Sequence, residues 1–476
     1  MERENLIFTL SGIRGIAEKD LDFNIIKKIS IAYGLWLEGE NNQVVLGKDT
    51  RPSGEIIEKA VIEGLSTVGL KVINFGVCPT PIIIHAKKRL NIQGGIIITG
   101  SHNPQEWNGL KILSTKTFLD NNDIKQILIK VNEIDLDSYL SKEVNSDQYI
   151  EYFNPIKDYI RDLYKYIDYE GIKDRNNLKV VVDTGAGAGK VATPQILKTM
   201  GCKVKVINND LIVNNIFPRE IEPIEKNLKD LIMEVWQGNH DIGFAHDSDA
   251  DRLAIIGENG VYYPEDIGLA LITDYYLKNY YESGKEIIFV TNLASSIRFE
   301  VIAERYGAQV IRTPIGERYL IEKMNEIIEN KSKNTLVFGG EGSCGGVIIP
   351  DFNNTRDGIF ASAKIIEILV KTGKKVSELV STLPKYYSYR EKIKIKNKNI
   401  NKIIKFLKKE LLEEGEEIEQ FNLDLRFGEE QDWFVLIHPS NTEPIIRVIS
   451  EARRESLARV YCEATSALVK LVISKL

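Results

Sequence analysis

The sequence predicts an α/β fold with three similar domains, each built on a mixed sheet, followed by a smaller C-terminal α+β domain. The chain has 476 residues, which is too long for one ordinary core and corresponds to three or four domains. Short β-branched runs alternate with helical periodicity through most of the sequence, as in βαβ units. Beyond residue 384 this alternation ends.

The first domain is expected over residues 1–148. Its strands are predicted from short β-branched runs at residues 44–47, 71–74 and 95–98. An amphipathic helix is predicted near 54–69, between the first two strands, and a polar stretch near 137–148 ends the domain.

The second domain is expected over residues 149–257 and opens with a helical pattern at 152–167. Its predicted strands are residues 179–183, 203–206 and 241–244.

The third domain is expected over residues 258–382, with a helix that ends near Tyr306. Its predicted strands are residues 287–290, 309–311 and 336–338. The fourth domain is expected over residues 383–476. It is predicted to contain a Lys-rich helix near 399–412, strands around 422–427 and 433–438, and a closing helix from about 453.

Composition excludes several classes of protein. Lys and Arg number 62 against 68 Asp and Glu, and the net charge of -6 has the wrong sign for a bulk nucleic-acid binder. Any anionic ligand must therefore be held by local groups.

The four cysteines are far apart in the sequence and form no C-x-x-C pair, so we expect unpaired thiols in a reducing compartment. The charged N-terminus leads into only a short apolar stretch, and no later segment has a membrane-length apolar run. These features predict a cytoplasmic protein without a membrane partner.

A serine loop follows the predicted strand at 95–98. Residues 99–104 read Thr-Gly-Ser-His-Asn-Pro, which places Ser101 and His102 where α/β sheets usually carry ligands. Taken alone, such a segment is more often an ordinary turn. A hydrolase elbow would need the pattern G-x-S-x-G, which this loop lacks, so an acyl-hydrolase function is excluded here.

Three carboxylates directly follow the strand predicted at 241–244. Asp247, Asp249 and Asp251 stand at alternate positions, and an extended backbone would direct all three to one side. Three hard oxygen ligands favour Mg²⁺ or a similar cation. A calcium loop of EF-hand type is the closest rival, but Arg252 occupies the place where that loop needs glycine. A solvated acidic turn is less favoured, because three like charges so close repel unless something neutralises them.

Two further loops offer polar groups for a ligand. Residues 338–346 carry five glycines around Glu341 and Ser343, and a carboxylate there suits sugar hydroxyls better than phosphate. Residues 439–444 contribute the hydroxyls of Ser440 and Thr442, the amide of Asn441 and turn-type N–H groups, with Arg447 nearby, a set suited to phosphate. Each could also be an ordinary turn.

The glycine-rich segment 185–189 superficially resembles a nucleotide-binding loop. Lys190 stands where the dinucleotide fingerprint needs glycine, and Thr184 and Val191 break the P-loop pattern. We interpret it as a tight structural turn.

Taken in order, the four sites resemble those of the α-D-phosphohexomutase superfamily, which includes phosphoglucomutases, phosphomannomutases and phosphoglucosamine mutases. The family's serine loop, T-A/G-S-H-N-P, is matched at 99–104, and its metal loop, D-G-D-G/A-D-R, at 247–252. Its sugar loop begins G-E-x-S, as at 340–343. Similar short motifs occur at residues 11–15, 47–53, 108–111 and 313–316. The wording of the metal, sugar and phosphate loops is similar to that of archaeal members.

The resemblance implies a heart-shaped chain whose central cleft is lined by one loop from each domain. It implies that phosphate resides on Ser101 and that Mg²⁺ is held by Asp247, Asp249, Asp251 and a phosphoryl oxygen at Ser101. The reaction would interconvert hexose 1-phosphate and 6-phosphate through a hexose 1,6-bisphosphate, which also serves as activator.

The resemblance also assigns expected roles to other side chains. Arg252 and Arg14 would steady the phosphoryl group, with His102 beside Ser101, and Lys111 is the candidate general acid/base. The substrate-binding groups would be Thr313, Gly316, Glu341, Ser343, Ser440, Asn441, Thr442 and Arg447. The only partner expected is a phosphosugar of glucosamine, mannose or glucose, bound by a monomer or a homodimer.

Two departures from the family pattern stand out. Many members continue the sugar loop with Gly-His, where this chain has Cys344 and Gly345. Many begin the phosphate loop with arginine, where this chain has His438, so the distal phosphate is expected to depend more on Arg447. Two alternatives stay open: a hexose-1,6-bisphosphate synthase of the same fold, and a non-catalytic sugar-phosphate sensor. The presence of a phosphorylatable Ser101 argues against the sensor.

Overall fold

The computed structural model describes residues 7–9, 12–37, 42–140, 145–331, 334–342, 346–395, 399–440 and 444–476. The chain forms two compact units. Met1–Gly268 and Cys344–Glu378 make the first, and Leu269–Ser343 and Leu379–Leu476 make the second. Helices α10 (Glu265–Tyr280) and α14 (Val376–Ser381) carry the chain from one unit to the other.

The first unit begins with a seven-stranded mixed sheet in the order β1-β2-β6-β5-β3-β4-β7. Its strands are β1 (Ile7–Thr9), β2 (Gly12–Ile16), β3 (Gln43–Lys48), β4 (Lys71–Val77), β5 (Gly94–Ile98), β6 (Trp107–Leu113) and β7 (Ile150–Tyr152). The strands β5, β3, β4 and β7 run parallel, while β6 returns antiparallel between β5 and β2. The three strands predicted in this region are confirmed, and β7 joins the sheet just past the predicted boundary at 148.

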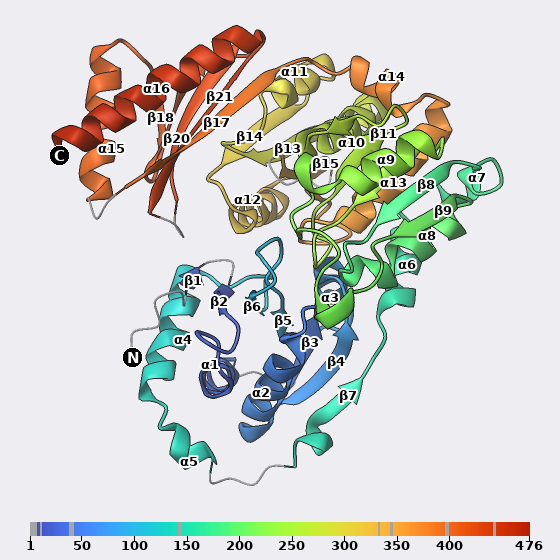
Figure 1. Cartoon of the computed structure of the whole chain (residues 1–476), viewed down its shortest axis with the longest axis vertical. Helices are drawn as coiled ribbons and strands as arrows, with labels where there is room; N and C mark the ends of the chain where they lie inside the picture. Colours follow the sequence, from blue (N-terminus) through green and yellow to red (C-terminus); the bar gives the residue numbers. More distant parts are fainter. Residues whose placement is uncertain are drawn as a thin grey trace. The chain divides into compact units, whose positions relative to one another are not determined.

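Helices cover both faces of this sheet. The helices α1 (Phe23–Trp36), α2 (Gly54–Thr67) and α4 (Asn121–Glu133) lie against one face (Figure 1). The core beneath them is largely aliphatic, with Leu46 and Ile96 fully buried. Because successive strand residues point to opposite faces, Gly47 faces the other side, where Ile83 of α3 (Thr80–Arg89) packs against it. The short α5 (Leu136–Leu140) and η1 (Ser146–Tyr149) lead to β7.

A second sheet in the same unit has the order β12-β11-β10-β8-β9. Its strands are β8 (Lys179–Asp183), β9 (Lys203–Ile207), β10 (Ile242–Ala245), β11 (Ala254–Gly257) and β12 (Tyr262–Tyr263). Its helices are α6 (Ile156–Leu163), α7 (Tyr169–Ile172), α8 (Thr193–Thr199), α9 (Lys229–Gln237) and α13 (Gly358–Thr372), with 3₁₀ turns η2 (Ala188–Val191), η3 (Val213–Asn215) and η4 (Glu225–Asn227). The predicted strands are confirmed, and the helix predicted at 152–167 begins only after Pro155. The short strand β16 (Gly346–Ile348) precedes α13.

The second unit contains the remaining two sheets. In one, β14 (Gln309–Thr313), β13 (Glu286–Asn292) and β15 (Thr335–Glu341) are parallel, with η5 (Tyr281–Ser283) before them and helices α11 (Arg298–Arg305) and α12 (Glu317–Asn330) between them. The other is antiparallel in the order β17-β21-β20-β19-β18. It consists of β17 (Tyr387–Lys394), β18 (Ile418–Phe421), β19 (Asp424–Glu429), β20 (Trp433–Pro439) and β21 (Ile445–Ala452). Helices α15 (Ile400–Glu413) and α16 (Glu455–Lys475) pack together on it (Figure 1).

The two sheets of the second unit are joined by a buried contact. Glu451 of β21 accepts hydrogen bonds from the Ser296 hydroxyl at 2.9 Å and the Ile297 N–H at 2.8 Å. Leu293 and Leu436 belong to one apolar cluster beside it. The predicted fold class, three α/β sheets with helices and a C-terminal α+β part, is confirmed.

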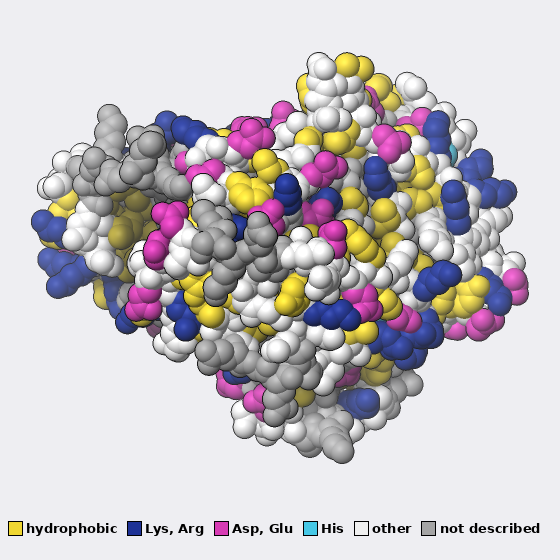
Figure 2. All heavy atoms as spheres, turned by 90° about the horizontal axis from the view of Figure 1, so that it is seen from below, with side chains coloured by type: hydrophobic (Ala, Val, Ile, Leu, Met, Phe, Trp, Pro, Cys, Tyr) yellow, Lys and Arg dark blue, Asp and Glu magenta, His cyan; other side chains and the backbone are white. Residues whose placement is uncertain are grey.

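Acidic and basic side chains intermingle on the face shown in Figure 2. None of the described helices is long and apolar enough to cross a bilayer. Cys78, Cys202 and Cys462 are buried free thiols, while Cys344 lies outside the described residues.

Candidate active site

Three predicted residues meet at one edge of the first sheet because of its strand order. Ser101 follows β5, and β6 runs back beside β5 so that Lys111 pairs with Ile97. Arg14 lies on β2, where it pairs with Gly109 of β6. The antiparallel return of β6 therefore places Lys111 and Arg14 beside the serine loop.

The serine loop is buried and held in an unusual backbone conformation. Ser101 is 1% exposed and has a φ of 50°, a left-handed value that a serine adopts only where the surroundings impose it. Its N–H donates to the Thr99 hydroxyl at 2.8 Å.

A buried arginine anchors this loop. Arg51, 2% exposed, donates to four backbone carbonyls, those of Ser101, Asn103, Pro104 and Trp107, at 2.7–2.8 Å. Asp49, just after β3, accepts from the Arg51 Nε at 3.2 Å and from the Thr99 hydroxyl at 2.6 Å. These two residues lie in the 47–53 motif, to which the sequence alone assigns no role.

The three aspartates converge as predicted, but not through an extended backbone. Residues 248–251 form a turn, with Ala250 at a left-handed φ of 57°. One carboxylate oxygen from each of Asp247, Asp249 and Asp251 lies within 4.8 Å of the others. The expectation of an extended segment was wrong, because the chain must reverse here to pass from β10 into the antiparallel β11.

The carboxylates leave three oxygens available to a cation. The Oδ1 atoms of Asp247, Asp249 and Asp251 are buried and have no hydrogen-bond partner among the described residues. Burying a charged acceptor unpaired is costly, so the arrangement is stable only if a positive group faces these atoms. Three hard oxygens at this spacing fit a divalent cation that prefers oxygen ligands.

Two cations already balance part of this charge. Lys111 Nζ donates to Asp249 Oδ2 at 2.6 Å and to Asp251 Oδ2 at 3.1 Å. Arg356, just before α13, donates to Asp251 Oδ2 at 2.7 Å. Sequence reasoning missed Arg356, since no local pattern connects it to a carboxylate 105 residues away.

The pKa values of the triad diverge for this reason. Burial and the neighbouring charges of Asp251 and Asp249 raise the pKa of Asp247 well above its ordinary value. Burial also acts to raise the pKa of Asp251, but Arg356 and Lys111 outweigh it and lower that pKa. Asp247 therefore depends most on an added positive charge to stay ionised.

Ser101 faces the triad directly. Its hydroxyl donates to Asp247 Oδ2 at 3.1 Å, and His102 Nδ1 lies 3.4 Å from the same hydroxyl. The charge of Arg252, together with burial, holds the pKa of His102 well below its usual value, so the imidazole is neutral. The Arg252 Nε lies 3.8 Å from Asp247 Oδ2.

Arg14 is held by the serine loop itself. Its Nη1 donates to Asn103 Oδ1 at 2.7 Å, and burial lowers its pKa somewhat from the high value of a free guanidinium. The five predicted catalytic residues and the three aspartates therefore lie within one unit of the molecule.

The glycine-rich segment 185–189 supports the metal loop from behind. A Cβ at Gly187 would lie 2.8 Å from the Asp247 carbonyl, so only glycine allows this close approach. The Ala188 N–H donates to the Ser248 carbonyl at 2.7 Å. This packing explains why the segment resembles a nucleotide loop without completing either pattern.

Two further contacts position the metal loop. Thr80 at the start of α3 donates its hydroxyl to Asp249 Oδ2 at 2.6 Å and its N–H to the Asp249 carbonyl at 3.0 Å. His246 lies 2.8 Å from the Arg252 carbonyl through Nδ1 and 3.0 Å from the Thr193 hydroxyl through Nε2. Burial lowers the pKa of His246 to about 4, so its neutral ring donates to the carbonyl.

The predicted sugar-binding residues lie in the second unit, at the carboxyl edge of its parallel sheet. Thr313 ends β14, Gly316 precedes α12 with a φ of 134°, and Glu341 ends β15. Glu341 is 5% exposed and accepts from Asn292 Nδ2 at 2.9 Å. Asn292, which sequence reasoning did not select, therefore orients this carboxylate. Ser343 lies outside the described residues.

The predicted phosphate-binding residues belong to the C-terminal sheet. Ser440 follows β20 and its N–H donates to the Ile445 carbonyl at 2.9 Å. Arg447 lies on β21, paired in register with His438. The Nδ1 atom of His438 lies 2.7 Å from Asp424 Oδ1. Asn441 and Thr442 lie outside the described residues.

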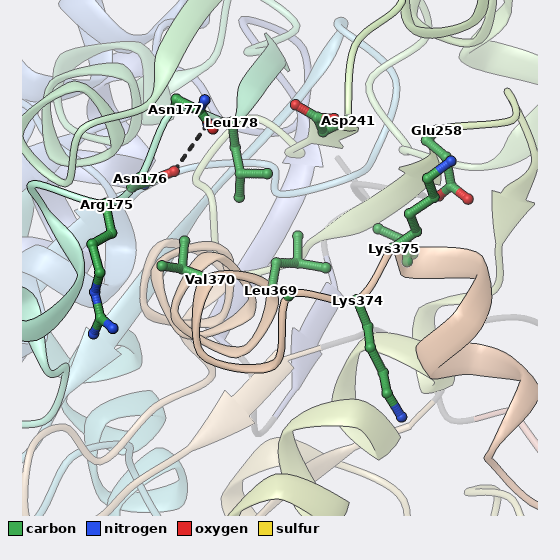
Figure 3. Close-up of a pocket in the computed structure, with 12 residues that line it drawn as sticks. Arg175, Asn176, Asn177, Leu178, Asp241, Glu258, Leu369, Val370, Lys374 and Lys375 are labelled. Atoms are coloured by element: carbon green, nitrogen blue, oxygen red, sulfur yellow. Dashed lines mark hydrogen bonds between the residues drawn. The ribbon is translucent and has the colours of Figure 1, made fainter.

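A hollow of about 270 Å³ occurs elsewhere in the first unit (Figure 3). It is lined by Leu178 and Asp241, which precede β8 and β10, by Glu258 after β11, and by residues at the end of α13. The three aspartates come after β10 and lie at the carboxyl ends of β8 and β10, opposite the hollow. Because open α/β sheets bind ligands beyond the carboxyl ends of their strands, the triad and not this hollow is the candidate site.

Comparison with known proteins agrees with this geometry. Three consecutive domains of phosphoglucomutase/phosphomannomutase match the chain: domain I at residues 5–138, domain II at 157–260 and domain III at 264–387. The chain belongs to the phosphoglucomutase/phosphomannomutase family. Within the α-D-phosphohexomutase superfamily, it is similar to archaeal members.

Two archaeal relatives align over nearly their whole length. A phosphoglucomutase/phosphomannomutase of Thermococcus kodakarensis is 38% identical over 96% of this chain and 97% of its own. A protein named "Probable phosphoglucosamine mutase" from Pyrococcus horikoshii is 35% identical over 98% of this chain and 99% of its own.

Among solved structures, a phosphoglucomutase/phosphomannomutase family protein of Burkholderia thailandensis shares the fold with a TM-score of 0.81. It is 23% identical, over 98% of this chain and 97% of its own. The protein is therefore a phosphohexomutase, an isomerase of carbohydrate metabolism.

Proposed function

We propose that this phosphohexomutase interconverts hexose 1-phosphate and hexose 6-phosphate by way of a phosphorylated Ser101 and a hexose 1,6-bisphosphate. The observation that carries the proposal is the buried Ser101 hydroxyl 3.1 Å from Asp247, beside three carboxylates that each have one oxygen without a partner in the described part of the chain. A hydroxyl in that position has a direct use only if it takes part in a metal-assisted group transfer.

Asp247, Asp249 and Asp251 would hold Mg²⁺ through their Oδ1 atoms, together with an oxygen of the phosphoryl group on Ser101. When bound, the ion would neutralise phosphoryl charge and help to align the donor and acceptor oxygens. Chain groups supply the rest of the positive charge: Arg252 lies beside Asp247, and Arg14 is held against the serine loop by Asn103.

In the first transfer, a substrate hydroxyl oxygen bonds to phosphorus as the bond from phosphorus to Ser101 Oγ breaks. Lys111 is the proposed acid/base for the proton of that hydroxyl, and Asp249 and Asp251 hold its Nζ atom in place. The neutral His102 can accept a hydrogen bond from the unphosphorylated Ser101 hydroxyl. The reverse transfer then returns the other phosphate of the bisphosphate to Ser101.

Substrate recognition is proposed for the second unit. Glu341 would accept hydrogen bonds from sugar hydroxyls, with Thr313, Gly316 and Ser343 near it in the family pattern. Ser440, Asn441, Thr442 and Arg447 would hold the phosphate that is not reacting. The names of the relatives favour glucosamine, glucose and mannose phosphates as the substrates to compare.

The proposal is tested by Ser101→Ala. We expect turnover of every hexose 1-phosphate to disappear while substrate binding persists, because the variant keeps the binding groups and lacks the group that carries phosphate. Near-normal turnover by the variant would contradict a covalent phosphoserine.

A trace of hexose 1,6-bisphosphate should sustain many turnovers of the wild-type enzyme. Net accumulation of bisphosphate from another phosphoryl donor would instead support a bisphosphate synthase. Binding without any turnover would support a sugar-phosphate sensor. A comparison of kcat/KM for glucosamine-, mannose- and glucose-1-phosphate then gives the preferred sugar.

A further inference from the structure

Ser248 lies between two of the proposed catalytic aspartates and reaches toward the serine loop. It is 1% exposed, and its Oγ lies 2.7 Å from the Ser101 carbonyl and 2.8 Å from Asp49 Oδ2. These contacts join residues 147 and 199 positions apart in the sequence. A hydroxyl has one proton, so Ser248 shares it between a carbonyl and a carboxylate.

The backbone of Ser248 is fixed from the opposite side. The Ala188 N–H donates to its carbonyl at 2.7 Å, and a Cβ at Gly187 would lie 2.9 Å from its Cα. With the main chain held against the glycine-rich segment, the Ser248 hydroxyl has a defined direction.

The groups that receive the hydroxyl are equally fixed. Asp49 Oδ2 also accepts from the Thr99 hydroxyl at 2.6 Å, and Thr99 Oγ1 in turn accepts from the Ser101 N–H. The Ser101 carbonyl also accepts from Arg51 at 2.8 Å. The Ser248 hydroxyl therefore completes a buried network that joins the metal loop to the serine loop, and buried networks of this kind hold their members rigidly when every group is satisfied.

Alanine and glycine have no hydroxyl and cannot make this bridge. We propose that Ser248 is a positioning residue. By holding the Ser101 carbonyl, it fixes Ser101 Oγ relative to the three aspartates, so that a metal ion and the phosphoryl group are bound cooperatively. The inference rests on the proposed phosphoserine mechanism.

The test measures Mn²⁺ affinity of the enzyme before and after Ser101 is phosphorylated with glucose 1,6-bisphosphate, with the phosphorylation state read by intact mass. In the wild type, phosphorylation should tighten Mn²⁺ binding. In Ser248→Ala we expect this gain and kcat to fall about 10- to 150-fold, the range for losing a hydrogen bond to a charged acceptor. Mn²⁺ affinity of the unphosphorylated variant should stay within about twofold, because its three aspartates are intact.

Ser248→Gly, which removes both the hydroxyl and the Cβ, provides a second variant. Ser30→Ala is the matched control, since Ser30 is also buried but donates to Ile26 within its own helix. That control should leave both kcat and the phosphorylation-dependent gain unchanged.

If phosphorylation tightens Mn²⁺ binding as much in both Ser248 variants as in the wild type, the inference is wrong. It is also wrong if the variants lose the same Mn²⁺ affinity with and without phosphate on Ser101, because that result would show a purely local effect. If the wild-type enzyme is neither phosphorylated nor active, the proposed function fails and the inference fails with it. Activity and phosphorylation of the wild type with no effect at Ser248 would refute the inference alone.

Discussion

The two ends of the second sheet both carry acidic and basic residues, yet only one has the features of a reaction site. At the end where β8 and β10 finish, Asp247, Asp249 and Asp251 are at most 1% exposed and three of their oxygens have no partner among the described residues. At the other end, Asp241 is exposed to solvent and accepts from the Lys179 N–H at 2.7 Å.

The second end also contains the hollow of about 270 Å³. In Figure 3 the charged groups of Arg175 and Lys374 extend away from the carboxylates of Asp241 and Glu258. The Glu258 carboxylate accepts hydrogen bonds from the N–H and the hydroxyl of Ser377. We therefore give less weight to open volume and to the number of charges as signs of a site. Buried charge without a partner is a better guide, because a fold tolerates its cost only where a ligand supplies the missing group.

The largest expected effect comes from removing the cation or one of its proposed ligands. Exhaustive chelation, or Asp249→Asn, should lower kcat by about 10³-fold or more, since metal assistance contributes several kcal/mol to phosphoryl transfer. Activity is followed as hexose 6-phosphate formed, and added Mg²⁺ should restore the chelated wild type. Full activity after chelation would contradict the proposal that the aspartate end of the sheet is a metal-dependent reaction site.

A smaller effect is expected at the anchor of the serine loop. Arg51→Met removes one donor from each of four buried carbonyls, which should lower the free energy of unfolding by about 3 kcal/mol or more and kcat by about 10²-fold. Denaturant unfolding and steady-state kinetics measure the two effects separately. Arg175→Met, an equal change at the exposed hollow, is the control. Equal results for the two variants would show that Arg51 has no special role.

The stability of the fold should be sensitive to acid at α3, the helix whose first residue, Thr80, contacts Asp249. Burial lowers the pKa of His85 to about 4, against an ordinary value near 6.5, although Asp162 Oδ2 lies 3.3 Å away. The folded state thus keeps His85 neutral while the unfolded chain protonates it. Stability is complete above about pH 6.5 and decreases as the pH falls toward 4, by at most about 3 kcal/mol.

Urea unfolding at pH 7.5 and pH 5 measures this loss. His85→Phe changes packing at both pH values but removes the titration, so the difference between the two pH values should shrink in the variant. An unchanged difference would assign the acid sensitivity to other groups.

The smallest effect is expected at the hollow itself. Asp241→Asn should change kcat/KM by less than about twofold for any hexose phosphate, because it alters an exposed group at the opposite end of β10 from the three aspartates. A larger loss of activity would show that the two ends of the sheet are coupled and would contradict the comparison.

Much of this architecture could be predicted from local sequence. The predicted strands of the four sheets lie where their β-branched runs lie, and Ser101 and the aspartates follow strands as expected. The strands β2 and β6 were not anticipated, because their residues are paired by distant neighbours and lack a strong local period. The predicted extended path of the metal loop was wrong, since the turn at Ala250 is imposed by the antiparallel return of β11.

The sequence by itself determined which side chains are available: a serine after a strand, three alternate carboxylates, a lysine and several arginines in family order. Only the tertiary structure decided which of their atoms meet. Arg356 reaches Asp251 across 105 residues and Ser248 reaches Asp49 across 199, while three buried Oδ1 atoms are left without a hydrogen-bond partner among the described residues. Local propensities act over a few residues, whereas these contacts depend on strand order and on the burial of charge, which exist only once the chain has folded.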